Sequence, residues 1–149
     1  MTTQEVINAL NSMVIEGPDD FDAVEKINKL MDELEKNSDA SLACEAMINL
    51  LEKHPEFEFG TPGEPVHSIE EHSGHYEELL YQSLERKPTD MTVWMLNRII
   101  NAEKDEEAKK DQLKIMRKCA KHPQADKMAK DSAMEYLKYQ KKWSNKKSA

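Results

Sequence analysis

Apolar residues recur every three or four positions along most of this chain, and charged residues fill the positions between them. This spacing puts the apolar side chains on one face of an α-helix, which has 3.6 residues per turn. The pattern predicts an all-α protein with about seven helices of roughly 12–20 residues. The apolar positions of the expected helices, in chain order, are Val6, Ile7, Leu10, Met13 and Val14; Phe21, Val24, Ile27, Leu30, Met31 and Leu34; Leu42, Ala43, Ala46, Met47, Leu50 and Leu51; Val66, Ile69, Tyr76, Leu79, Leu80 and Leu84; Met91, Val93, Trp94, Leu96, Ile99 and Ile100; Ala108, Leu113, Ile115 and Met116; and Met128, Ala129, Ala133, Met134 and Leu137.

The junctions between these helices share one kind of sequence. The first helix stops at Gly17-Pro18, and the fourth bends at Gly74 before it continues. Residues 87–90, Lys-Pro-Thr-Asp, combine a lysine at a helix end with an aspartate at the next helix start, and both charges complement the helix dipole. Such junctions favour antiparallel helix pairs stacked as a short α-solenoid, although a compact helical bundle fits the pattern as well.

Residues 54–65 form the longest irregular stretch, because three prolines and two glycines prevent a helix there. Within it, glutamate alternates with Phe57 and Phe59, which suits a short extended segment whose phenyl rings face the core. We expect Trp94 and Asn97, on the fifth helix, to hold this stretch in place. Pro65 suits the first turn of the helix that follows.

The length of 149 residues fits a single helical domain over residues 1–149, with a flexible C-terminal tail at 144–149. The chain has no apolar run long enough for a transmembrane helix and no signal peptide, so we expect a cytoplasmic protein. Its two cysteines lie far apart in expected helices, which favours reduced, partly buried thiols.

Charge is unevenly distributed along the chain. Residues 1–75 contain 17 acidic and 4 basic side chains, a balance of −13, whereas residues 76–149 contain 12 acidic and 17 basic, a balance of +5. An acidic half of this strength repels nucleic acid and attracts a basic protein. We therefore expect no direct nucleic-acid partner and no membrane partner, and we interpret the lysine-rich C-terminus as a solvated helix end.

Four of the five histidines fall within residues 54–75. His72 and His75 are three positions apart, a spacing that on a helix would let both bind one metal ion. A zinc site needs three or four converging ligands, however, and the chain has no His-Glu-x-x-His motif, no nucleophile elbow and no phosphate-binding glycine loop. We expect no metal, no cofactor and no enzymatic activity, and we keep a metal-dependent hydrolase as the least favoured alternative.

Three stretches of the chain carry a resemblance to a known family. They are residues 53–63 (Lys-His-Pro-Glu-Phe-Glu-Phe-Gly-Thr-Pro-Gly), residues 66–70 (Val-His-Ser-Ile-Glu), and residues 83–89 together with 92–99 (Ser-Leu-Glu-Arg-Lys-Pro-Thr and Thr-Val-Trp-Met-Leu-Asn-Arg-Ile). They resemble small helical bacterial proteins of HEAT-like architecture that include immunity proteins of polymorphic and contact-dependent growth-inhibition toxin systems. The resemblance implies a HEAT-like solenoid and a cytoplasmic protein that neutralises a toxin domain, often a basic nuclease.

The leading hypothesis is therefore an immunity protein that acts as a monomer in a 1:1 complex with the C-terminal domain of its toxin, by occlusion. It requires the negative side chains to gather on one exposed surface. The alternative is a helical-repeat adaptor or regulator, which predicts an apolar groove for a peptide or protein. The side chains expected to contact the partner are Glu56, Glu58, Glu64, His67, Glu70, Glu71, His72 and Tyr76.

Overall fold

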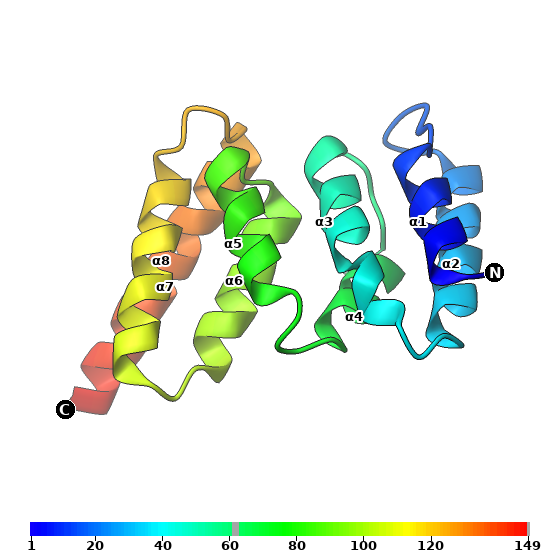
Figure 1. The fold of residues 1–149 in the computed structure, drawn as a ribbon. Helices are drawn as coiled ribbons and strands as arrows, with labels where there is room; N and C mark the ends of the chain where they lie inside the picture. Colours follow the sequence, from blue (N-terminus) through cyan, green and yellow to red (C-terminus); the bar gives the residue numbers. More distant parts are fainter. Residues whose placement is uncertain (61–62, 149) are drawn as a thin grey trace. The chain divides into compact units, whose positions relative to one another are not determined.

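The chain is helical throughout the part that the computed structural model describes, which is residues 1–60 and 63–148, with side chains up to residue 142. The all-α class predicted from the sequence is confirmed, and the stacking of helix pairs into a HEAT-like α-solenoid stays a prediction. The elements in these ranges are α1 (Thr3–Asn11), α2 (Phe21–Glu35), the 3₁₀-helix η1 (Ala40–Ala43), α3 (Cys44–Lys53), α4 (Glu64–Glu70), α5 (Glu77–Arg86), α6 (Asp90–Ala102), α7 (Glu106–Ala120) and α8 (Lys127–Ser148), all drawn in Figure 1.

The chain divides into two compact units, Met1–Leu80 and Tyr81–Ala149, where the sequence analysis expects one domain. The division has a physical basis, because each unit buries large apolar side chains of its own. These are Ile27, Leu34, Met47, Ile48, Leu51, Ile69 and Leu80 in the first unit, and Leu84, Met95, Leu96, Ile100 and Met116 in the second.

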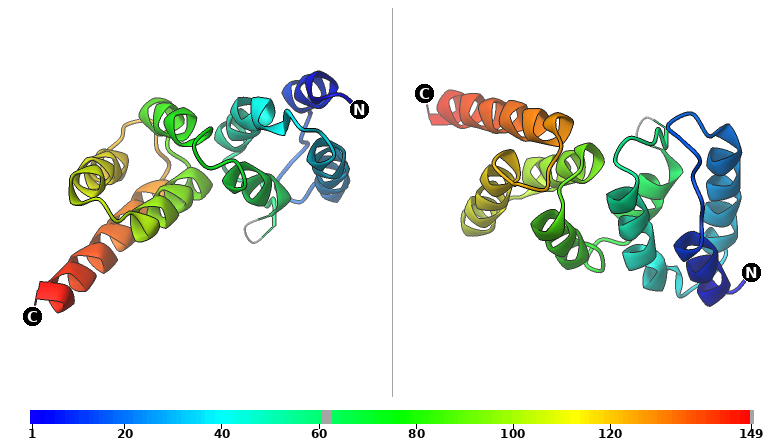
Figure 2. Two further views of the ribbon diagram at one scale, coloured as in Figure 1. Left: turned by 60° about the horizontal axis from the view of Figure 1, so that its bottom comes forward. Right: turned by 90° about the horizontal axis from the view of Figure 1, so that it is seen from above.

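In the first unit, α1 packs against α2, η1 and α3, and α4 packs against α2 and α3 (Figures 1 and 2). Helix α1 starts with a capping box, in which Thr2 and Glu5 each accept a hydrogen bond from the other's backbone N–H. Asn37, which follows α2, donates its amide to the carbonyl oxygen of Met1 and to the hydroxyl of Thr3. The N-terminus is thereby tied to the α2–η1 connection.

In the second unit, α6, α7 and α8 alternate in direction, and α8 packs against both α6 and α7 (Figure 1). Thr89 and Thr92 form a buried capping box at the start of α6. Gln140 on α8 donates to the side-chain oxygens of Asn97, at 3.1 Å, and Asn101, at 2.6 Å. These hydrogen bonds join α8 to α6 through a side chain that is only 3% exposed.

Several helix ends differ from those expected. Helix α1 stops at Asn11, well before Gly17-Pro18, because Ser12 caps its C-terminus with a hydroxyl that bonds back to Asn8. The predicted bent fourth helix is two helices, α4 and α5, separated by a turn in which Gly74 has φ = +92°. Helix α4 starts at Glu64 and so includes the last two residues of the expected loop of 54–65, and α8 continues through Ser148 into the expected C-terminal tail.

Both cysteines are free and buried, one in each unit. Burial raises the pKa of the Cys44 thiol to about 11 and that of the Cys119 thiol to about 12. Thiolate is the reactive form of cysteine, so neither side chain is suited to nucleophilic chemistry at neutral pH. Among the described residues, none of the helices combines the length and the apolarity needed to cross a lipid bilayer.

Candidate partner-binding surface

The stretch after α3 is built as its alternation predicts. The rings of Phe57 and Phe59 are buried and meet edge to face, with 4.7 Å between their centroids and 89° between their planes. Glu56 and Glu58 alternate with them and are exposed. Gly63 closes the stretch with φ = +101°, and a β-carbon there would collide with the carbonyl oxygen of Phe59. Glycine is therefore required at this position to keep the two rings in the core.

The predicted contact residues do not all reach the surface. Glu56, Glu58, Glu64, His67 and Glu71 are exposed, and Glu70 and His72 are half-buried.

Tyr76 is buried, at 7% exposure, so its predicted role as a partner contact is wrong. The prediction treated the segment from Pro65 to Leu84 as one bent helix, whereas residues 71–76 form a turn between α4 and α5, within which Gly74 has a positive φ. The carboxylate of Glu77 accepts two hydrogen bonds from the Gly74 N–H, at 2.9 and 3.0 Å, and thereby fixes the start of α5. Tyr76 thus lies directly before α5, with its side chain buried, and not on α4.

The histidines are not arranged as a metal site. His72 and His75 lie in the turn between α4 and α5, where the backbone N–H of His75 bonds to the carbonyl of His72, so the helical spacing assumed for shared coordination does not apply. Within residues 1–60 and 63–142, no group of three or more His, Cys, Asp or Glu side chains could hold a metal ion.

Trp94 and Asn97 have partners in the second unit. The guanidinium of Arg98 lies over the Trp94 ring, 4.8 Å from its centroid, and Asn97 accepts a hydrogen bond from Gln140. The Phe57–Phe59 stretch belongs to the first unit. That Trp94 and Asn97 hold this stretch stays a prediction.

The two units carry opposite charge. Residues 1–80 contain 19 acidic side chains and 4 lysines, a balance of −15, and residues 81–149 contain 10 acidic and 17 basic side chains, a balance of +7. None of the 19 carboxylates is buried and 14 are exposed. They occur on every α-helix of the first unit, so the negative charge is a property of the whole unit and not only of the predicted face around residues 56–71.

One carboxylate of the first unit, that of Glu33, pairs with two cations. Glu33 contacts both the N-terminal ammonium, at 3.2 Å, and Lys36, at 3.4 Å, and these two cations lower its pKa in that order of importance. Four lysines and one terminal ammonium cannot neutralise 19 carboxylates, whichever pairs they form. Most of the negative charge in this unit is therefore not balanced by cations of the same unit.

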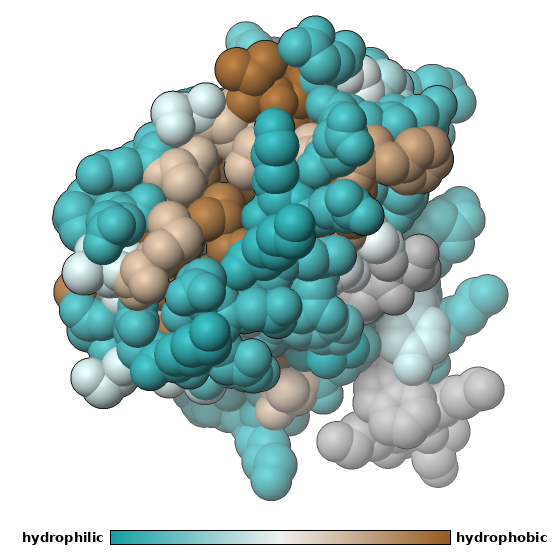
Figure 3. Space-filling model, turned by 90° about the vertical axis from the view of Figure 1, so that its right-hand side faces the viewer, coloured by the Kyte–Doolittle hydropathy of each residue, from teal (hydrophilic) through white to brown (hydrophobic). Residues whose placement is uncertain are grey.

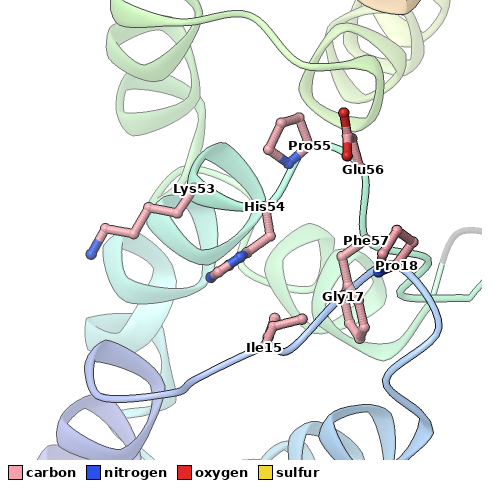
Figure 4. A pocket seen from close by; sticks show the side chains of 8 residues that line it. All are labelled: Ile15, Gly17, Pro18, Lys53, His54, Pro55, Glu56 and Phe57. Carbon is pink, nitrogen blue, oxygen red and sulfur yellow. The ribbon is translucent and has the colours of Figure 1, made fainter.

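A pocket lies between the α1–α2 connection and the stretch after α3 (Figure 4). Ile15, Gly17 and Pro18 line one side and residues 53–57 the other, around a volume of about 190 Å³. His54 and Ile15 point toward one another across it, whereas the Lys53 side chain extends away (Figure 4). The pocket thus offers a mixed apolar and polar lining next to the predicted contact residue Glu56.

Sequence reasoning missed two exposed apolar side chains on this side of the unit. Val14 and Phe21 were both assigned to buried helix faces, yet they are 71% and 76% exposed. Val14 lies beyond the end of α1, and Phe21 lies two residues before Ala23, where the buried face of α2 begins. Two helical residues subtend about 200°, so a helical projection of α2 places Phe21 opposite its buried face. Leu42, Met128 and Met134 were likewise assigned to helix faces and are exposed.

Figure 3 shows the face of the molecule that includes α1 and α2. Hydrophobic residues gather at its upper end, at the height where Figure 1 places the α1–α2 connection, and hydrophilic residues cover most of the rest.

Comparison with known proteins finds no matching family model, no matching curated protein and no matching solved structure.

Proposed function

We propose that this protein binds a cationic protein through its acidic first unit and neutralises it by occlusion, as an immunity protein does to its toxin. The partner would be the C-terminal domain of a cognate toxin, a basic nuclease being the class that best fits the charge. Binding takes place in the cytoplasm with one copy of each protein. This assignment follows the family that the sequence resembles, and the charge of the first unit supports it independently.

The observation that carries the proposal is the excess of 15 negative charges over 80 residues, nearly all of it on exposed or half-exposed carboxylates. Such an excess destabilises a compact unit by self-repulsion, and a bound cationic surface relieves it. Opposite charge across an interface also speeds association and selects partners. Inhibition by occlusion needs no chemistry from the inhibitor, because covering the surface that substrate must reach is sufficient.

The test screens basic toxin nuclease domains for binding to the full chain and then uses a domain that binds to compare charge reversals in one unit at a time. Glu25→Lys, Glu56→Lys and Glu71→Lys change three exposed side chains of the first unit. We expect the association rate to fall about tenfold at low salt and the difference to shrink as salt increases, because salt screens the attraction. Protection of cells that express the toxin domain should weaken in parallel.

A matched control makes the same change of charge in the second unit. Glu85→Lys, Asp111→Lys and Glu135→Lys also replace three exposed carboxylates. This triple variant should associate within about twofold of the wild-type rate, since the reversed residues lie outside the proposed surface. Equal slowing by both triple variants would show that total charge matters and not the first unit. Failure of the unmodified chain to bind or protect would overturn the proposal outright.

A further inference from the structure

The two most exposed large apolar side chains in the described part of the chain flank the same connection. Val14 precedes and Phe21 follows the turn between α1 and α2, at 71% and 76% exposure. Single exposed apolar residues are common on protein surfaces, but here one lies within the nine-residue connection 12–20 and the other directly follows it. Aromatic side chains in such a position are frequent anchors of protein interfaces.

The half of the connection next to α2 is anchored by hydrogen bonds of Asp20. Its carboxylate accepts hydrogen bonds from the backbone N–H groups of Glu16, at 3.0 Å, and Ala23, at 3.1 Å. The Asp20 N–H in turn donates to the carbonyl of Gly17. These bonds lower the pKa of Asp20, so the carboxylate stays ionised and keeps its acceptor role at neutral pH. A surface that is ordered before binding loses less conformational entropy when a partner arrives.

The same connection lines the pocket described above. Ile15, Gly17 and Pro18 face the residues that follow α3, among them the buried ring of Phe57 and the exposed carboxylate of Glu56 (Figure 4). Exposed carboxylates also stand along the connection and the first turn of α2, at Glu16, Asp19 and Asp22. The local chemistry is thus apolar at the anchors and acidic between and around them.

We propose that the α1–α2 connection is the docking point for the cationic partner, which lays an apolar side chain over Phe21 and Val14 and places a lysine or arginine at the pocket rim beside Glu56. The inference rests on the proposed function, in that it takes the partner to be a cationic protein. It adds to that proposal the place on the first unit at which the partner docks. Because carboxylates occur on every α-helix of the unit, charge attracts the partner without choosing where it lands, and the apolar anchors make that choice.

The experiment uses two defined peptide probes and the full-length chain. One probe is a helical peptide of leucine and lysine, and the other replaces every leucine with serine at the same charge. With the ¹⁵N-labelled chain, the leucine–lysine peptide should shift the backbone NMR signals of residues 14–22 and 53–57 most strongly. The serine–lysine peptide should bind more weakly. It should shift signals across the acidic unit, with no larger shifts at residues 14–22 and 53–57.

Variants then test whether the peptide binds to Val14 and Phe21 in particular or to any exposed apolar side chain. The double variant Val14→Ser and Phe21→Ser should weaken binding of the leucine–lysine peptide about tenfold and leave the serine–lysine peptide unchanged. Leu42→Ser is the matched control, because Leu42 is 67% exposed and lies on η1, at the end of the unit opposite to the connection (Figure 1). It should stay within about twofold of wild type for both peptides.

The outcomes distinguish this inference from the proposed function. Unchanged affinity of the double variant for the leucine–lysine peptide, or shifts centred on η1 or on the second unit, would overturn the docking point and leave the acidic-unit proposal standing. Loss of binding in the Leu42→Ser variant equal to that in the double variant would overturn it as well. If neither peptide binds the wild-type chain, both the docking point and the attraction of cationic partners are wrong.

Discussion

The two units of this chain are both built from helices but differ in where their polar groups lie. The first unit places 19 carboxylates outside and has only one buried polar residue, Thr3, among those described. The second unit buries several polar side chains and carries a net charge of +7. These buried residues are Ser83, Thr89, Thr92, Gln112 and Gln140.

This difference indicates that exposed charge serves recognition, whereas buried polar groups serve structural specificity. Buried polar groups need hydrogen-bond partners, so they fix the packing of the helices that carry them. Exposed charge contributes little to stability but determines which molecules approach the surface and how fast. We infer that buried polar groups specify the helix packing of the second unit more strictly than that of the first.

The largest expected effect comes from truncating each core separately. Ile48→Ala in the first unit and Leu96→Ala in the second each remove a side chain with at most 1% exposure, and each should cost about 2–4 kcal/mol of unfolding free energy. Both tryptophans, Trp94 and Trp143, belong to the second unit, so fluorescence reports that unit while circular dichroism reports both. We expect the Ile48→Ala variant to keep the wild-type fluorescence midpoint during urea unfolding.

For the Leu96→Ala variant, fluorescence and circular dichroism should shift together at the second unit's transition. A fluorescence midpoint that moves equally in the two variants would mean that the chain unfolds as one cooperative body. The comparison between the units would then hold for their surfaces only.

The two capping boxes offer a smaller and more direct comparison. Thr2 on α1 is exposed and Thr89 on α6 is only 1% exposed, yet both accept a hydrogen bond from the third residue of their helix. Thr89→Ala should cost about 1–2 kcal/mol, because it also strips a partner from the buried Thr92 hydroxyl. Thr2→Ala should cost about 0.5 kcal/mol, since water replaces the lost contact. Chemical denaturation measures both, and serine at either position should restore most of the loss.

The pH dependence of the first unit provides a third test. Hydrogen bonds from the backbone of Glu16 and then of Ala23 lower the folded-state pKa of Asp20 below its unfolded value. Its contribution to stability is therefore complete above the unfolded pKa and disappears as pH falls through the folded pKa. Asp20→Asn should lower the melting temperature at pH 7 and lose its effect in strong acid.

Asp32→Asn is the control for that test, because it removes an exposed carboxylate from the middle of the same helix. Melting curves between pH 7 and pH 2 compare the three proteins. A deficit of the Asp20→Asn variant that stays constant over this range would argue against an ionised cap.

The smallest effect is expected from thiol reagents on the folded chain. With pKa values raised to about 11 and about 12, Cys44 and Cys119 contain almost no thiolate at pH 8, and both are buried. Labelling should be negligible over the time in which a free thiol reacts fully, and mild denaturant should accelerate it. Peptide mass spectrometry then assigns each label to Cys44 or Cys119 and so to the opening of one unit. Rapid labelling of either thiol without denaturant would contradict the burial described here.

Much of the fold follows from local sequence signals. Helices α2, α6 and α7 begin after the side chains Asp20, Thr89 and Asp105, each of which accepts a hydrogen bond from its own helix. These signals lie within four residues of the element that they define, so a linear reading finds them. The burial of Phe57 and Phe59 also follows from a local alternation.

The errors arose where a distant or backbone feature decides the outcome. A glycine in an expected helix indicates either a bend or a break, and only the positive φ of Gly74 and the contact from Glu77 decide for a break. The pocket joins segments more than 30 residues apart, so no local pattern reveals it. The exposure of Phe21, in contrast, was available from a helical projection of α2 once Asp20 was taken as its cap.

The alternation at residues 56–59 has a consequence for how such a surface diversifies. The phenylalanines and Gly63 fix the path of the backbone, while Glu56 and Glu58 are exposed, and of these Glu58 accepts a hydrogen bond from the Gly60 N–H. Substitutions at the outward positions can therefore accumulate without unfolding the chain, and each would alter the set of molecules that it recognises. The segment is a natural place to build a library of variants when a new binding specificity is sought.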